Sequence, residues 1–183
     1  MTKSDLISLI ERDPTRLHIL RLVRALGLPD CWVAAGFVRS AVWDHLHSRP
    51  SSPLRSDVDV VWFDADNVEA EQDVELEARL RTLDTTVDWS VQNQARMHLR
   101  NGDAPYASAV QAMTCWPETA TAVGVRLNRR GEIEVAAPLG LDDLFALIVR
   151  PTPKFKGAKY GIYLQRIQSK QWQTLWPCLV YLG

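Results

Sequence analysis

The sequence of 183 residues has few cysteines and no long apolar run. Its three cysteines, Cys31, Cys115 and Cys178, are odd in number and far apart, so they fit neither a zinc-binding spacing nor a disulfide framework. No apolar stretch approaches the roughly 18 residues of a membrane span, and acids interrupt the N-terminus MTKSDLISLIERD, unlike a signal peptide. These absences exclude secreted, membrane and zinc-finger proteins and predict a cytoplasmic protein without a membrane partner.

The sequence also has no large excess of acidic or of basic residues. The 21 basic and 22 acidic side chains leave a formal charge of −1, which speaks against nonspecific nucleic-acid binding by the whole surface but allows a local basic patch. With 46% hydrophobic residues the chain can bury a core, and no repeat or low-complexity linker divides it. We expect one domain over 1–183, with a core at about 28–150 and a helical extension at 151–183.

Helical and strand patterns alternate along the chain, which is typical of an α/β protein with a small mixed sheet flanked by helices. Asp13-Pro14 marks a helix start and Gly27 a helix end. The acid-rich segment 64–84 predicts an amphipathic helix whose buried stripe is Val68, Leu76, Leu80 and Leu83. The other expected elements are helices at 37–47 and 140–149, strands at 31–35, 57–63 and 87–91, a hairpin at 121–137 and a loop at 48–56.

Two aspartates open the second expected strand. Successive side chains of a strand face opposite ways, so Asp57 and Asp59 share one face while Val58 and Val60 share the other. Neighbouring carboxylates repel each other unless a cation lies between them, and Mg²⁺ takes oxygen ligands together with substrate phosphates. The pair therefore predicts a site for Mg²⁺ or Mn²⁺, with two exposed acids on an edge strand as the alternative.

A glycine turn upstream favours the metal site. The expected strand 31–35 is followed by Gly36 and a helix that begins FVRS, which places a helix N-terminus at the same end of the sheet. Free backbone N–H groups and the helix dipole attract phosphate there, and glycine allows close backbone approach. Gly36, Arg39 with its charge and Ser40 with its hydroxyl are therefore candidate nucleotide-binding residues.

Together, AAGFVRS at 34–40 and SDVDVV at 56–61 resemble the signature of the polymerase-β-like nucleotidyltransferase superfamily, in the GGxVRD…DxD form of CCA-adding enzymes. Ala35 stands where that pattern has its first glycine, and Ser40 where it has an aspartate. Longer motifs resemble a bacterial branch described as nucleotidyltransferase-like proteins of unknown substrate, over about residues 31–177. These motifs are W-x-V-x-N-Q-A-R-M-H at 89–98, WPETATAVGVRL at 116–127 and APLGLDDLF at 137–145, followed by RP.

The resemblance implies a metal-dependent nucleotidyltransferase. It implies transfer of a nucleoside monophosphate, with AMP expected, from an NTP to a hydroxyl of an unidentified small molecule, protein or RNA, with Mg²⁺ or Mn²⁺ as cofactor. It also implies a third acidic ligand on a neighbouring strand. On the strand 87–91, Asp88 is the acid on the face that it shares with Ser90, so we expect Asp88 there, with Glu118 and Glu134 as further candidates.

Two segments allow alternative interpretations. The polar segment Asn93, Gln94, Arg96 and His98 either contacts the nucleotide, with Arg96 on a phosphate, or caps strand and helix ends. The stretch 150–170 has six basic residues and no acid, so it is either a solvated helix face or a grip on phosphates. The alternatives to an active transferase are a nucleotide-binding or regulatory protein without turnover, and an RNA-binding protein.

Overall fold

The structure is a computed structural model that describes residues 1–50, 54 and 56–183. The loop expected at 48–56 therefore lies partly outside the described residues. None of the described helices has both the length and the apolar composition needed to cross a bilayer.

In the described part of the chain, five strands form a central mixed sheet in the order β3-β2-β1-β4-β5. Strands β2 and β3 run parallel and are joined by helix α4, the kind of crossover that a parallel pair needs. The remaining neighbours are antiparallel, and β4 and β5 form the expected hairpin. The strands are β1 (Trp32–Ala34), β2 (Val58–Trp62), β3 (Trp89–Asn93), β4 (Gly124–Leu127) and β5 (Ile133–Ala136).

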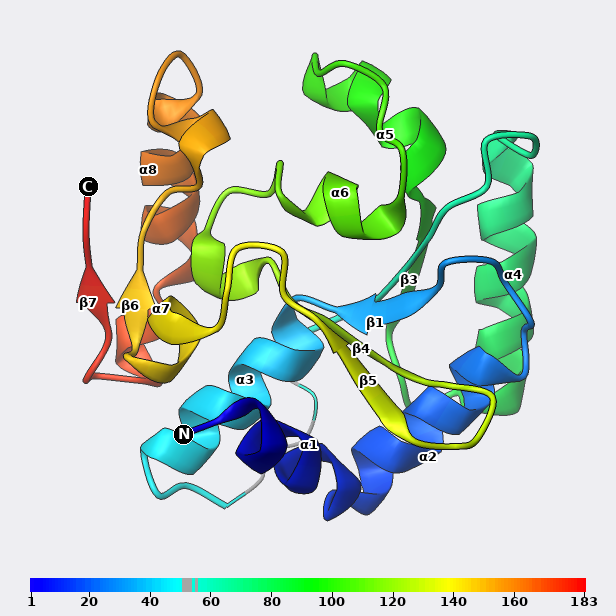
Figure 1. The fold of residues 1–183 in the computed structure, drawn as a ribbon, viewed down its shortest axis with the longest axis horizontal. Helices are drawn as coiled ribbons and strands as arrows, with labels where there is room; N and C mark the ends of the chain where they lie inside the picture. The colour runs from blue at the N-terminus through cyan, green and yellow to red at the C-terminus, as the bar shows by residue number, and fades with distance from the viewer. Residues whose placement is uncertain (51–53, 55) are drawn as a thin grey trace.

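Helices cover both faces of the sheet, as expected for this fold class (Figure 1). The first four helices pack with one face in the main core, and α6 packs with Ala34 and Val61 on the other face. Near the C-terminus, a short parallel pair of strands, β6 (Ile148–Val149) and β7 (Val180–Tyr181), stands apart from the main sheet. The helices are α1 (Lys3–Glu11), α2 (Pro14–Arg24), α3 (Gly36–Leu46), α4 (Ala70–Leu83), α5 (Gln94–Asn101), α6 (Ala109–Met113), α7 (Asp142–Phe145) and α8 (Tyr160–Lys170).

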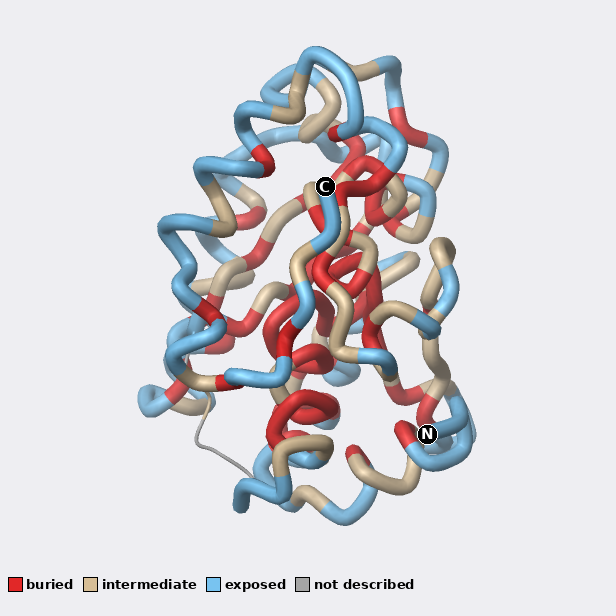
Figure 2. Tube along the Cα trace, turned by 90° about the vertical axis from the view of Figure 1, so that its left-hand side faces the viewer, coloured by how far each residue is buried: buried red, intermediate tan, exposed pale blue. Residues whose placement is uncertain are grey.

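Helix α3 is the most enclosed helix of the site region. Eight of its 11 residues are buried, and buried segments gather at the centre of the molecule (Figure 2). Trp43 meets the rings of Trp172 and Trp176 edge-on, with centroids 5.5 and 5.1 Å apart. Trp176 Nε1 also donates a 2.9 Å hydrogen bond to the buried Asp44. The C-terminal segment thereby fixes α3, and with it the position of the α3 N-terminus.

The helix expected at 140–149 is wrong in its second half. Helix α7 ends at Phe145, and Leu147 has a φ of 58°, in the left-handed region that breaks a helix. Ile148 and Val149 then pair with Val180 and Tyr181 as β6. This pairing joins residues about thirty positions apart, so no local pattern revealed it.

The amphipathic stripe expected for 64–84 is confirmed at Leu76 and Leu80, which pack in the core, and is wrong at its two ends. Leu80 is fully buried, but Val68 lies before α4 and is exposed, and so is Leu83. The buried residue of the first turns is instead an acid, Asp73. Helix α1, which no expectation covered, begins with a capping box between Thr2 and Asp5.

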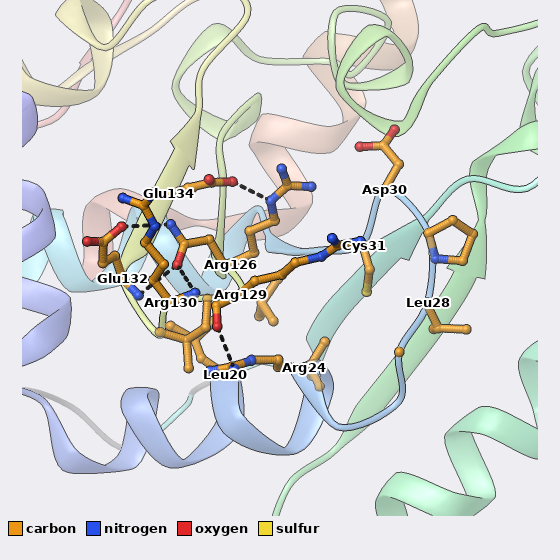
Figure 3. Close-up of a pocket in the computed structure, with 16 residues that line it drawn as sticks. Leu20, Arg24, Leu28, Asp30, Cys31, Arg126, Arg129, Arg130, Glu132 and Glu134 are labelled. Carbon is orange, nitrogen blue, oxygen red and sulfur yellow. Dashed lines mark hydrogen bonds and ion pairs between the residues drawn. The ribbon is translucent and has the colours of Figure 1, made fainter.

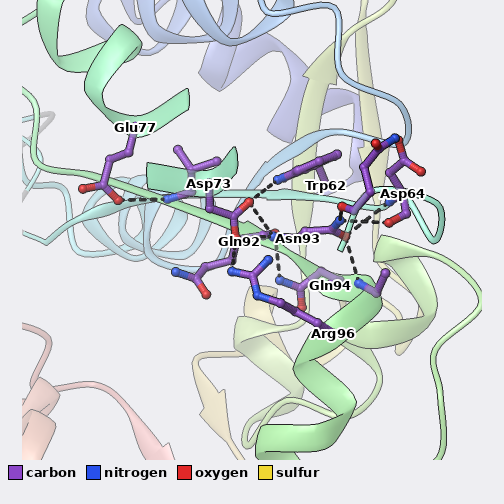
Figure 4. A network of polar contacts seen from close by, with 11 residues as sticks. Trp62, Asp64, Asp73, Glu77, Gln92, Asn93, Gln94 and Arg96 are labelled. Atoms are coloured by element: carbon purple, nitrogen blue, oxygen red, sulfur yellow. Dashed lines mark hydrogen bonds and ion pairs between the residues drawn. The ribbon is translucent and has the colours of Figure 1, made fainter. Parts of the chain in front are cut away.

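Asp73 is buried because it organises a polar network that joins α4, β2, β3 and α5 (Figure 4). Its carboxylate accepts hydrogen bonds from Trp62 Nε1 at 2.8 Å and from the Asn93 backbone N–H at 2.9 Å. Arg96 completes the network through an ion pair with Asp73. The Asn93 side chain caps α5 by accepting from the Ala95 N–H at 3.0 Å. Asn93 and Arg96 thus hold the end of β3 and the start of α5, in line with the interpretation of this segment as a cap.

We expect Asp73→Ala to destabilise the protein by about 3–5 kcal/mol, because it leaves the buried Trp62 N–H and the Arg96 guanidinium without their acceptor. Urea unfolding monitored by tryptophan fluorescence measures the loss. Glu75→Ala, at an exposed position of the same helix, is the matched control. Equal stability of the two variants would contradict the role given to the network.

Candidate active site

Asp59 opens onto a cleft of about 750 Å³. The cleft lies where β1 ends and β2 begins, and residues of β3, α5, α8 and the segment 115–117 complete its walls. A volume of this size suits a nucleotide-sized ligand. Lys159 Nζ bridges two of the walls, since it donates to the Asn101 carbonyl at 2.7 Å and to Asp103 Oδ1 at 2.8 Å.

The two aspartates of the DxD pattern differ in environment but act on each other. Asp57 is exposed just before β2, and Asp59 is half-buried within it. Burial and, next, the charge of Asp57 raise the pKa of Asp59 to about 6, although Arg39 and Arg166 oppose the shift. Within the described residues, no hydrogen bond or ion pair is formed by the Asp59 carboxylate. A half-buried acid beside a second acid, without a partner, is the arrangement that a bound cation would relieve.

The N-terminus of α3 lies beside this pair because of Gly36. A Cβ atom at position 36 would lie 2.8 Å from Ser56 Oγ, so glycine lets the residue before Asp57 approach the first turn of the helix without displacing its side chain. The Val38 N–H of that turn donates to the Ala35 carbonyl at 3.2 Å, which leaves the N–H groups of Gly36 and Phe37 as potential phosphate donors. Ser40, in the second turn, is half-buried.

Ala35 lines the cleft in a conformation that favours glycine. Its φ of 53° and ψ of −117° place it outside the regions open to residues with a Cβ atom. Its N–H donates to the Val123 carbonyl at 2.9 Å, and the buried helix that follows holds its other side. The surrounding structure therefore imposes strain at the position where CCA-adding enzymes have glycine.

The strand register decides which residue lies next to Asp59. In the parallel pair, Asp59 is opposite Ser90 and Val58 is opposite Trp89. Ser90 lines the cleft, whereas Asp88 lies outside β3, is exposed, and accepts the Val58 N–H through its backbone carbonyl at 2.7 Å. Among the described residues, no group of three or more His, Cys, Asp or Glu side chains is gathered to hold a metal.

Arg39 faces the core more than the cleft. It is 6% exposed, and burial lowers its pKa to about 10. Its Nη1 donates to Thr121 Oγ1 at 3.0 Å, and its guanidinium carbon lies 4.3 Å from the ring centroid of Trp172. Arg39 thus links α3 to the Thr121 segment and to the C-terminal tryptophans. Arg96, engaged with Asp73, is likewise not among the residues that line the cleft.

Sequence reasoning missed the pairing of Arg166 with Glu118. Glu118 is fully buried and accepts from Arg166 Nε at 2.6 Å, while Arg166 lines the cleft from α8. The two residues are 48 positions apart, so no motif joins them. Glu134, the other further candidate, pairs instead with Arg126 at 2.7 Å, away from Asp59.

The basic stretch 150–170 is largely neutralised. Arg150 pairs with Asp143, Lys154 and Lys159 pair with Asp103, and Arg166 pairs with Glu118. Four of its six basic residues therefore have acidic partners, which weakens the interpretation of this helix as an open basic surface for nucleic acid.

A second cavity of about 870 Å³ lies at the other end of β1, between α2 and the β4–β5 hairpin (Figure 3). Its carboxylates already have partners: Glu134 pairs with Arg126, and Asp30 Oδ1 accepts from Trp32 Nε1 at 2.8 Å. This cavity has no counterpart of the Asp57–Asp59 pair, so the cleft is the candidate active site.

Comparison with known protein families assigns the chain to one of them. The sequence model of a family described as Nucleotidyltransferase matches residues 21–181. The chain belongs to this nucleotidyltransferase family. The comparison with curated proteins gives no match.

Solved structures with a similar fold include enzymes that add CCA. An NMR structure described as revealing a CCA-adding enzyme head domain is 35% identical, with a TM-score of 0.90, covering 100% of this chain and 96% of that one. The Thermotoga maritima CCA-adding enzyme complexed with tRNA is 16% identical, with a TM-score of 0.60, covering 98% of this chain and 42% of that one. A CCA-adding enzyme in complex with CTP is 16% identical (TM-score 0.62; 98% and 43% covered). The chain spans less than half of these two enzymes, whose likeness shows the fold alone. The predicted fold and enzyme class are confirmed.

We expect Ala35→Gly to stabilise the nucleotidyltransferase by about 1 kcal/mol, because relief of the strained φ outweighs the greater freedom of glycine in the unfolded chain. Ala34→Gly, in the adjacent strand residue, should instead destabilise it. Thermal unfolding of both variants measures the effect, and a loss of stability in Ala35→Gly would show that the backbone there is not strained.

We expect Asp59→Asn to raise the stability of the metal-free protein at pH 8 by about 2 kcal/mol. The pKa of Asp59 rises on folding from an ordinary 3.8 to about 6, so its ionisation destabilises the folded state above pH 6 and not below pH 4. Chemical unfolding in EDTA at both pH values measures the difference. The exposed Asp66→Asn is the control, and a destabilised Asp59→Asn at pH 8 would refute the burial argument.

Proposed function

We propose that this nucleotidyltransferase transfers a nucleoside monophosphate, AMP in the first instance, from an NTP to a hydroxyl of an acceptor in a divalent-metal-dependent reaction. The observation that carries the proposal is the unpaired, half-buried Asp59 beside Asp57 at the mouth of the cleft. Family membership supports nucleotidyl transfer in general. The metal, the AMP group and the acceptor are the parts that remain to be tested.

The residues present fit Mg²⁺ or Mn²⁺. Asp57 and Asp59 supply two carboxylates, and Mg²⁺ is commonly bound by one or two carboxylates together with substrate phosphates. A bound divalent cation supplies charge neutralisation and Lewis acidity at the reacting phosphate. We propose Asp57 and Asp59 as its ligands. Asp88 remains our third candidate, although the register puts Ser90 beside Asp59.

The chain's own groups are arranged to hold the triphosphate. The N–H groups of the first turn of α3 are available for phosphate oxygens, and Gly36 keeps them close to the aspartates. Arg166 uses Nε on Glu118, which orients its remaining guanidinium nitrogens at the cleft wall. Arg39 and Ser40 act from behind this turn, Arg39 by fixing it to Thr121.

A second function, nucleotide binding without turnover, has specific support. Ala35 stands in a strained glycine conformation, and Ser90 instead of an acid lies opposite Asp59. Both features depart from the pattern of CCA-adding enzymes that the sequence resembles. Calorimetry separates the two functions, since tight NTP binding without any transfer product would favour the regulatory protein.

We expect the wild-type chain, given α-phosphate-labelled ATP with Mg²⁺ or Mn²⁺, to transfer label to an acceptor in a cell extract. Asp57→Asn and Asp59→Asn should each lower transfer by about 100-fold or more, because each removes charge stabilisation at the reacting phosphate. Scintillation counting of fractionated product measures the rate.

Asp66→Asn, an exposed acid beyond β2, is the control and should keep the wild-type rate. Label transfer that persists in the double variant of Asp57 and Asp59 would place the metal site elsewhere.

A further inference from the structure

The cavity at the start of β1 has the features of a ligand site that the transfer reaction does not use. We call it the arginine groove and define it by Arg24 of α2, Arg126 of β4, and Arg129 and Arg130 of the hairpin turn. It lies at Asp30 and Cys31, just before β1, and at Val33 within it, whereas the cleft begins at Ala35 beyond the other end of that strand. The two hollows are therefore separate.

The floor of the arginine groove is apolar, and its rim carries four arginines together with the carboxylates of Asp30, Glu132 and Glu134 (Figure 3). Leu20, Val23 and Val33 line it and are at most 5% exposed. Cys31 also lines it, and burial raises the pKa of its thiol to about 12, so no thiolate adds negative charge. A buried apolar floor beneath exposed guanidinium groups suits a ligand with a flat, weakly polar body and an anionic end.

Charge is unbalanced at the rim. Arg126 is used by Glu134 and lies 4.1 Å above the ring centroid of Trp32. Arg24 Nη2 donates to the backbone carbonyl of Arg129 at 3.1 Å. In the described part of the chain, no carboxylate pairs with Arg24, Arg129 or Arg130. Asp30 and Glu132 also line the groove but bond to Trp32 and Asn128, so four guanidinium groups face three carboxylates and the groove keeps a surplus of positive charge.

The hairpin turn presents these arginines from a fixed backbone. Asn128 Oδ1 accepts from the N–H groups of Arg130 and Glu132 at 2.9 and 3.0 Å, and the Glu132 carboxylate accepts from Asn128 Nδ2 at 2.9 Å. Gly131 takes a φ of 83°, which suits glycine. The bond from Arg24 to this turn joins it to α2, so the rim is pre-organised.

We propose that the arginine groove binds a small phosphorylated molecule of nucleotide size, its phosphate on Arg24, Arg129 and Arg130 and its ring on the apolar floor. A cavity of about 870 Å³ holds one such ligand. The net charge of −1 disfavours a long polyanion, which would meet the acidic remainder of the surface. Because the groove lies away from Asp59, its ligand is bound and not consumed.

The experiment titrates the isotope-labelled full chain in EDTA and follows backbone amide shifts by NMR. The probes are AMP, adenosine, inorganic pyrophosphate and a single-stranded oligonucleotide. We expect AMP to shift the amides of 126–131, adenosine to leave them unchanged and pyrophosphate to bind more weakly than AMP. Shifts confined to Ala35 and Ser90 would report the cleft alone and overturn the proposal.

Charge-reversal variants test the arginines. Arg129→Glu/Arg130→Glu should weaken AMP binding at 126–131 by tenfold or more, because it removes two charge-assisted contacts. Arg79→Glu/Arg81→Glu, on α4, makes the same change in net charge and should leave the affinity unchanged. An equal loss in both variants, or an oligonucleotide that binds more tightly than AMP and is released by salt, would refute a small-ligand site. A wild-type amide spectrum outside the turn confirms that each variant is folded.

Discussion

The repulsion between two neighbouring carboxylates is the constraint around which the cleft is built. Solvent weakens this repulsion at Asp57, which is exposed. Asp59 lies in β2, between β1 and β3, and is half-buried. Arg39 and Arg166 lower its pKa from a distance without bonding to it. Folding therefore keeps an acid in an unfavourable state that a ligand would improve, which is typical of functional sites and rare in purely structural ones.

Backbone strain is concentrated at the same place. Ala35 holds its left-handed φ because the strand before it and the buried helix after it leave no other path for the chain. The energy that sustains this geometry comes from α3, whose buried face packs on Trp172 and Trp176 far away in the sequence. Removing the tryptophan contacts would therefore affect the cleft through α3, although neither tryptophan lines it.

Local patterns predicted the parts of the site that depend on local geometry. Gly36 marked the turn into α3, and the strand pattern placed Asp59 in β2, although Asp57 precedes that strand. The neighbour of Asp59 depends instead on the register of β2 against β3, which an offset of one residue changes completely, and here it is Ser90. The pair Glu118–Arg166 and strand β6 depend on contacts between distant segments, which spacing along the chain does not encode.

The cationic side chains near the two ends of β1 differ in whether they form ion pairs. At the cleft, Arg166 and Lys159 are tied to Glu118 and Asp103, so they stay in place without a ligand and their charge is partly cancelled. At the groove, no carboxylate of the described residues forms an ion pair with Arg129 or Arg130, although Glu132 of the same turn, bonded to Asn128, lines the groove as well. Neutralised cations can position a substrate but supply little net positive charge, whereas cations without an ion pair can take their counter-charge from a ligand. If the proposed metal site is correct, we expect an anion to bind the groove without a metal and the cleft only with one.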